Sequence, residues 1–192
     1  MQADLLIHSA GQVITVASPG GPKRGAAMSE LGIITDGAVA VRDGRIMAVG
    51  PSDELRRQVN ASQSLSAGGN LVLPGFVDPH THLVWAGERS AEFEMRVGGA
   101  TYMDIMAAGG GIMSTVRQTR AASLDELVSQ TRPRLARMLA HGTTTIEIKS
   151  GYGLSLVDEE RALRIAREVT DETTFLGAHV VPAEFAHDRE AY

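Results

Sequence analysis

A short run near the middle of the sequence reads Pro74-Gly75-Phe76-Val77-Asp78-Pro79-His80-Thr81-His82. On a β-strand, residues i and i+2 point to the same face, so His80 and His82 can direct two imidazoles at one point. Neutral imidazole is a common ligand of zinc and iron. The run therefore indicates a metal site at a strand end. The alternative is a pair of ordinary histidines, one of them bonded to the backbone.

Downstream of this run, strand-like and helix-like segments alternate. Residues 143–148 and 173–181 read as strands, and residues 156–169 read as a helix between them. This alternation is typical of parallel βα units. The carboxyl ends of the strands in a βα barrel carry the active site, and this context favours the metal interpretation of the histidine pair.

A long helix is expected before the second strand. Ser123 and Glu126 have the spacing of a capping box at its start, and apolar residues then recur at helical spacing. Pro133 should kink or divide this helix. Gly142 suits its C-terminal cap.

Upstream of the run, short strands and turns predominate. Residues 38–42 and 45–49 flank Asp43-Gly44, and an Asp-Gly pair between two β-prone runs predicts a hairpin with a type I′ turn. A short helix is expected from Ser52, with the serine as its N-cap. The first 70 residues therefore read as a small β domain.

Composition narrows the class of protein. The chain has 192 residues, with 18 Lys+Arg against 23 Asp+Glu, a formal charge of −5 and a pI of about 5.7. This balance gives no electrostatic footprint for nucleic acid or an anionic membrane. Cysteine is absent, so disulfides and thiolate metal sites are excluded. No apolar run approaches the roughly 20 residues of a membrane span, and the start lacks signal-peptide features, so we expect a cytoplasmic protein.

The histidine run resembles the first-strand metal motif of the amidohydrolase superfamily, and residues 37–46 resemble the small β domain that precedes the barrel in those enzymes. Further segments narrow the resemblance to the imidazolonepropionase family: Ala86-Gly87-Glu88-Arg89, Gly109-Gly110-Gly111-Ile112-Met113-Ser114-Thr115-Val116, Glu147-Ile148-Lys149-Ser150-Gly151-Tyr152-Gly153-Leu154 and Phe175-Leu176-Gly177-Ala178-His179-Val180-Val181-Pro182. The resemblance covers essentially the whole chain.

The resemblance implies an α/β fold in which a small β-sandwich-like domain, residues 1–70, precedes a metal-dependent hydrolase (β/α)₈ TIM-like barrel, residues 71–192. A complete barrel takes about 250 residues. The 121 residues from Val72 to Tyr192 suffice for only about the first three βα units. The chain is therefore expected to be the N-terminal part of such an enzyme, with a β domain that C-terminal strands normally complete.

The implied activity is metal-dependent hydrolysis of the cyclic amide 4-imidazolone-5-propanoate to N-formimidoyl-L-glutamate, a step of histidine degradation. The cofactor is one divalent metal, zinc or iron, and the partner is a small-molecule substrate rather than nucleic acid or membrane. A homodimer stays open. Two other readings also stay open: another amidohydrolase or aminohydrolase acting on a heterocyclic ring, and an inactive fragment that lacks the later metal ligands.

The resemblance also implies roles for individual residues. His80 and His82 match the two first-strand metal ligands. Arg89 and Tyr152 match substrate-binding residues, the guanidinium for the propanoate carboxylate, and His179 matches a histidine that contacts the imidazolone ring. Without the resemblance, these three read as a surface arginine, a packing tyrosine and a core histidine. The remaining metal ligands and an acid/base carboxylate are expected beyond residue 192.

Overall fold

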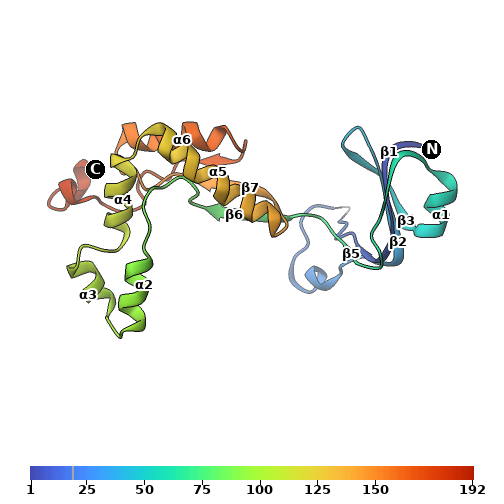
Figure 1. Cartoon of the computed structure of the whole chain (residues 1–192), viewed down its shortest axis with the longest axis horizontal. Coiled ribbons are helices and arrows are strands. Elements are labelled where there is room, and N and C mark those ends of the chain that lie inside the picture. The colour runs from blue at the N-terminus through green and yellow to red at the C-terminus, as the bar shows by residue number, and fades with distance from the viewer. Residues whose placement is uncertain (19) are drawn as a thin grey trace. The chain divides into compact units, whose positions relative to one another are not determined.

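The computed structural model describes residues 1–18 and 20–192, which form two compact units, Met1–Pro74 and Gly75–Tyr192 (Figure 1). The division lies four residues after the predicted boundary at residue 70. The difference arises because the short strand β5 (Leu71–Val72) pairs with the first strand of the chain and so belongs to the N-terminal unit.

The N-terminal unit contains one mixed sheet with strand order β3-β2-β1-β4, and β5 also pairs with β1. Strand β1 runs antiparallel to β2 and parallel to β4 and β5. The single sheet is consistent with a small β domain, and the predicted sandwich stays a prediction. The elements before β5 are β1 (Gln2–Ile14), the 3₁₀ helix η1 (Gly25–Ser29), β2 (Ile33–Arg42), β3 (Arg45–Pro51), α1 (Ser52–Gln58) and β4 (Asn60–Ser66).

The predicted hairpin is confirmed between β2 and β3. Arg42 pairs with Arg45, and Asp43 and Gly44 both have positive φ values, 51° and 70°, as a type I′ turn requires. The expected cap of the following helix is wrong. Helix α1 starts at Ser52, but the Ser52 hydroxyl accepts a hydrogen bond from the backbone N–H of Ser9 at 2.9 Å and caps nothing in its own helix.

The C-terminal unit is built on the parallel sheet β6-β7-β8. Helices lie between consecutive strands, so the predicted βα units are confirmed, while closure into a barrel stays a prediction. The elements are β6 (Phe76–Thr81), α2 (Ser90–Val97), α3 (Tyr102–Ala107), α4 (Ile112–Ala121), α5 (Leu124–Ala140), β7 (Thr143–Lys149), α6 (Leu156–Arg167), β8 (Thr173–Thr174), η2 (Ala183–Phe185) and η3 (Arg189–Ala191).

Helix α5 has the predicted ends. The Ser123 hydroxyl accepts from the backbone N–H of Glu126, and the Glu126 carboxylate accepts from the backbone N–H of Ser123, which completes the capping box. Gly142 follows the helix with φ +90° and donates its N–H to the carbonyl of Leu139. Pro133 lies inside α5 without dividing it, so of the two predicted effects only a kink stays a prediction.

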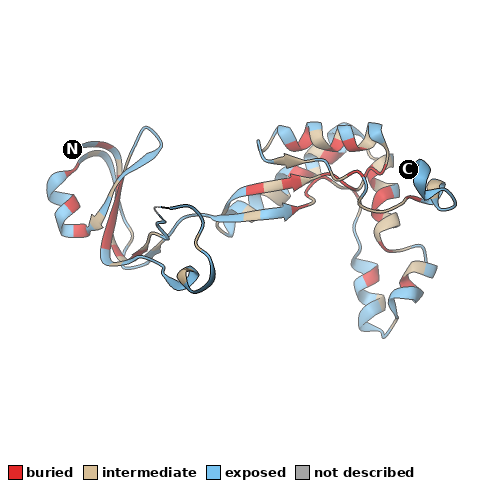
Figure 2. Cartoon of the chain, turned by 180° about the vertical axis from the view of Figure 1, so that it is seen from behind, coloured by how far each residue is buried: buried red, intermediate tan, exposed pale blue. Residues whose placement is uncertain are grey.

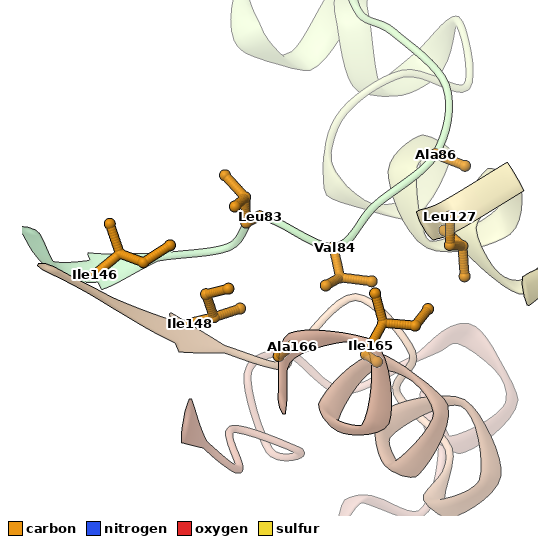
Figure 3. Packing of buried hydrophobic residues seen from close by; sticks show 9 residues of the cluster. Leu83, Val84, Ala86, Leu127, Ile146, Ile148, Ile165 and Ala166 are labelled. Carbon is orange, nitrogen blue, oxygen red and sulfur yellow. The ribbon is translucent and has the colours of Figure 1, made fainter. Parts of the chain in front are cut away.

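Helices α5 and α6 cover one face of the parallel sheet. Figure 3 shows Ile146 and Ile148 on the same side of β7, in one buried cluster with Leu83 and Val84 and with Ile165 and Ala166 of α6. Side chains two apart on a strand share a face, which is why alternate residues of β7 are buried. In Figure 2 the helices are buried toward the strands and exposed on their outer sides. The segment after β6 and helix α5 complete the cluster with Leu83, Val84, Ala86 and Leu127, together with Ala162 of α6.

The third strand is much shorter than residues 173–181, so this prediction is wrong. Strand β8 ends at Thr174 because its only neighbour in the described part of the chain, β7, ends at Lys149. Beyond that point the N–H of Leu176 donates to the Ser150 hydroxyl instead of a strand carbonyl. Consequently His179 lies in an irregular segment and not on a strand.

Helix length and polarity decide whether a helix could cross a membrane. Across residues 1–18 and 20–192, every helix is too short or too polar to cross a bilayer.

Candidate active site

Four aromatic side chains gather at the carboxyl ends of the parallel strands. The rings of His80 and His82 have centroids 5.4 Å apart, and the His82 ring lies 5.0 Å from Tyr152 and 4.7 Å from His179. The chain reaches this place from β6, from the turn after β7 and from the segment after β8. The structure thus brings together four of the five residues that the sequence singles out.

His82 is the central ring of this cluster. Its Nδ1 atom is buried and has no hydrogen-bond partner within the described residues. Burial, together with the neighbouring His179 and His80, lowers the pKa of His82 to about 4. The ring is therefore neutral near pH 7, which is the protonation state that binds a metal ion.

His179 is oriented by the backbone of the turn after β7. Its Nδ1 lies 3.0 Å from the carbonyl oxygen of Gly151, and since a carbonyl can only accept, Nδ1 carries the proton. Gly151 has φ +129°, and a Cβ there would lie 2.8 Å from that same Nδ1. Glycine at this position is what lets the His179 ring approach the turn.

The donor set suits part of a metal site. His80 and His82 present two imidazoles side by side, and the buried Nδ1 of His82 lacks a protein partner. No group of three His, Asp or Glu side chains with metal-ligand spacing occurs in the described ranges. A catalytic zinc normally has three protein ligands. The two histidines therefore fit as two ligands of a metal ion, and within the described residues they do not form a complete three-ligand set.

Arg89 is held by a buried carboxylate. Its Nε and Nη2 atoms donate to one oxygen of Glu92, at 2.9 and 2.6 Å, while the other oxygen accepts from the N–H of Gly111 at 2.9 Å. The hydrogen bonds from Arg89 hold the pKa of Glu92 below its ordinary value. Because Glu92 is 8% exposed and Arg89 is 41% exposed at its side chain, the pair anchors a guanidinium that still faces solvent.

Arg89 and Tyr152 line the same cavity. This cavity has a volume of about 250 Å³ and is also lined by Trp85 and Thr115. The Arg134 guanidinium lies over the Trp85 ring at 3.5 Å from its centroid and fixes that wall. Since Tyr152 also contacts the His82 ring, it joins the cavity to the histidine cluster.

A polar network lies at the end of β7, just before the turn that carries Tyr152. The Glu147 carboxylate accepts hydrogen bonds from the Lys149 ammonium and the Thr174 hydroxyl, and the bond from Lys149 is the main reason that the pKa of Glu147 is lowered. Lys149 is thus engaged by a carboxylate of its own strand.

Sequence reasoning missed Glu92. The charged segment around Arg89 is typical of a solvated surface, and that reading hides its one buried member. The available signal was the i, i+3 spacing of Arg89 and Glu92 at the start of a helix, which brings the two side chains together. The second contact of Glu92, with the N–H of Gly111, joins residues 19 positions apart and leaves no comparable local signal in the sequence.

Comparisons with known proteins agree with the resemblance. A family profile, the imidazolonepropionase-like composite domain of bacteria, matches residues 37–58. The chain is 53% identical to the imidazolonepropionases of Symbiobacterium thermophilum and Chloroflexus aggregans, over 98% of its own length and 46% of theirs. The match lies in their N-terminal part, so the chain spans about half the length of the curated relatives it matches.

Solved structures support the fold. An adenosine deaminase from Xanthomonas campestris with bound zinc aligns with a TM-score of 0.54 at 21% identity, covering 87% of this chain and 32% of the deaminase. The guanine deaminase of E. coli aligns with a TM-score of 0.58 at 16% identity, covering 88% of this chain and 35% of that one. At these identities, the alignments bear on the fold alone.

Proposed function

We propose that the protein is an imidazolonepropionase, which hydrolyses 4-imidazolone-5-propanoate to N-formimidoyl-L-glutamate in histidine degradation. The 53% identity to curated imidazolonepropionases supports this assignment. The observation that carries it structurally is the cavity shared by Arg89 and Tyr152, next to a cluster of three histidines. A cationic anchor beside a ring-binding cluster matches a substrate with a carboxylate tail and a heterocyclic ring.

Arg89 is assigned to the propanoate carboxylate. Glu92 accepts the Nε–H and one Nη2–H, which leaves the second Nη2–H and both Nη1–H donors to bind the substrate carboxylate. A guanidinium held on one side in this way is pre-oriented, and binding the carboxylate then costs less side-chain entropy. Tyr152 lies between Arg89 and His82 and is assigned to align the substrate between the two.

His179 is assigned to the imidazolone ring. Its proton stays on Nδ1, bonded to Gly151, so its Nε2 is a hydrogen-bond acceptor in the neutral ring. An acceptor suits a ring N–H of the substrate. Stacking on His82 keeps this acceptor in place.

His80 and His82 are assigned to one divalent metal ion, zinc or iron. When bound, such an ion activates water for attack on a carbonyl carbon near neutral pH. The neutral state of His82 and its unpartnered Nδ1 support this assignment. We further propose that the protein is cytoplasmic and acts on a small-molecule substrate. Whether it forms a homodimer is a question for measurement of its mass in solution.

The test is turnover by the full-length protein of 4-imidazolone-5-propanoate against a panel of cyclic amides and nucleobase-like amidines. Preferred turnover of the imidazolone supports the proposal, and preferred deamination of a purine or pyrimidine overturns it. Metal content is measured in parallel. His80→Ala and His82→Ala should each lower bound zinc or iron, while His187→Ala, an exposed histidine outside the cluster, should leave it unchanged.

A further inference from the structure

The turn that carries Tyr152 is held from two sides by charged side chains outside the substrate cavity. The turn follows β7 and contains two residues with positive φ, Gly151 at +129° and Leu154 at +52°. Such a backbone is strained for leucine and persists only where its surroundings hold it. Gly153 is also required, because a Cβ there would lie 2.6 Å from the backbone of helix α6.

Glu159 holds the N–H groups of this turn. It lies in the first turn of α6, and one carboxylate oxygen accepts from the backbone N–H of Gly153 at 2.9 Å and of Leu154 at 2.6 Å. The residue is only 1% exposed, and its other oxygen is buried without a partner within the described residues. Burying a carboxylate is costly, so its place here requires these hydrogen bonds.

Arg120 holds the carbonyl groups of the same two residues. From the end of helix α4, its Nε donates to the carbonyl of Gly153 at 2.6 Å and its Nη2 donates to that of Leu154 at 2.9 Å. Its Nη1 pairs with Glu184 at 2.8 Å. Two charged side chains from two helices thus satisfy the backbone N–H and C=O groups of Gly153 and Leu154, the two residues that follow Tyr152.

We propose that Arg120 and Glu159 are positioning residues, which hold the turn so that Tyr152 is already aligned when substrate binds. This inference rests on the proposed function only for the identity of the substrate. Without the two side chains, the turn becomes mobile and each binding event has to order it again, which weakens binding. Neither residue lines the cavity shared by Arg89 and Tyr152.

The first experiment measures the turn without substrate. Hydrogen exchange at the amides of Gly153 and Leu154 should become at least 10-fold faster in Glu159→Ala than in the full-length wild-type protein. The matched control is Glu160→Ala, whose carboxylate lies on the exposed side of the same helix and pairs with Arg164. Unchanged exchange at these two amides in Glu159→Ala would overturn the proposal whatever the substrate proves to be.

The second experiment measures coupling to Tyr152 in turnover. Glu159→Ala should raise KM about 10-fold, because the turn that carries Tyr152 must then be ordered in each binding event, with a smaller change in kcat. In a Tyr152→Ala background, the same change should alter KM less than 2-fold, since the residue it positions is gone. A full 10-fold effect in both backgrounds would show that Glu159 does not act through Tyr152.

Two conservative variants keep the test valid if the alanine variant does not fold. Glu159→Gln retains an acceptor oxygen for Gly153 and Leu154 and should keep KM within about 3-fold. Arg120→Lys keeps the charge but lacks the planar guanidinium fork that reaches both carbonyls and Glu184 at once, so it should raise KM and speed amide exchange. A Lys variant that matches wild type in both readouts would contradict the role of Arg120. If wild type fails to turn over the imidazolone while exchange responds as stated, the proposed function alone is wrong.

Discussion

The imidazole rings of His82 and His179 stack with their planes 5° apart and their centroids 4.7 Å apart. One ring follows β6 and the other lies about 100 residues later, in a segment without regular structure. Their contact depends on the carbonyl of Gly151, which fixes His179 by its Nδ1. The histidine cluster is therefore sensitive to a position that carries no side chain.

Gly151→Ala should disrupt this cluster. The new Cβ would lie 2.8 Å from Nδ1 and 3.1 Å from Cβ of His179, and alanine is strained at φ +129°. We expect a loss of about 1–3 kcal/mol in the free energy of unfolding and a clear rise in KM, because His179 must move. The control is Gly20→Ala, whose Cβ would meet nothing within 4 Å. Thermal unfolding and steady-state kinetics check both variants, and a wild-type KM in Gly151→Ala would contradict the placement of His179 at the substrate.

Arg89→Ala should raise KM about 10- to 100-fold with little change in kcat. It removes a charged contact with the carboxylate that is already made in the ground state, worth about 1.5–3 kcal/mol. The control is chemical. An imidazolone without the propanoate tail should be turned over equally poorly by wild type and variant. A loss of the same size for this tailless substrate would assign Arg89 to something other than the carboxylate.

Glu92→Gln should change how stability depends on pH. The folded-state pKa of Glu92 is lowered by Arg89, so its contribution is fully present above its ordinary pKa of 4.5 and is lost as pH falls through the lowered value. Wild type should therefore exceed the variant in unfolding free energy at pH 7, and the difference should shrink toward pH 3. Denaturant unfolding at several pH values measures this. A difference that stays constant across the range would show that the carboxylate is not ionised against Arg89.

The sequence predicts the local features of the fold well, because they depend on neighbouring residues. The hairpin at Asp43-Gly44 and the cap at Ser123 require only a turn geometry and a spacing of three residues. The βα alternation is likewise visible as a change of hydrophobic period. The length of the third strand cannot be predicted in this way. A strand continues only where a neighbouring strand offers hydrogen bonds, and β7 stops at Lys149.

The candidate site divides in the same way. The convergence of His80 and His82 follows from strand geometry, whereas the positions of Arg89, Tyr152 and His179 came from the resemblance. Neither strand geometry nor the resemblance predicted the side chains that support these residues. Glu92 and Glu159 act by accepting hydrogen bonds from the backbone N–H groups of residues up to 19 positions away. Such contacts do not follow from any periodic pattern in the sequence.

Ser123→Ala should destabilise the C-terminal unit without touching the site. The variant loses the hydroxyl that accepts from the Glu126 N–H at the start of α5, a cap worth about 1 kcal/mol. The control is Ser129→Ala, whose exposed hydroxyl bonds only the Glu126 carbonyl within the same helix and should change stability by less than about 0.5 kcal/mol. Because Leu127 near the start of α5 belongs to the same buried cluster as Ile146 and Ile148 of β7, fraying of the first turn of α5 loosens this core. Denaturant unfolding of the two variants, with KM as a second readout, should show a stability loss for Ser123→Ala alone and an unchanged KM for both. Equal stability of the two variants would mean that the capping box contributes nothing to α5.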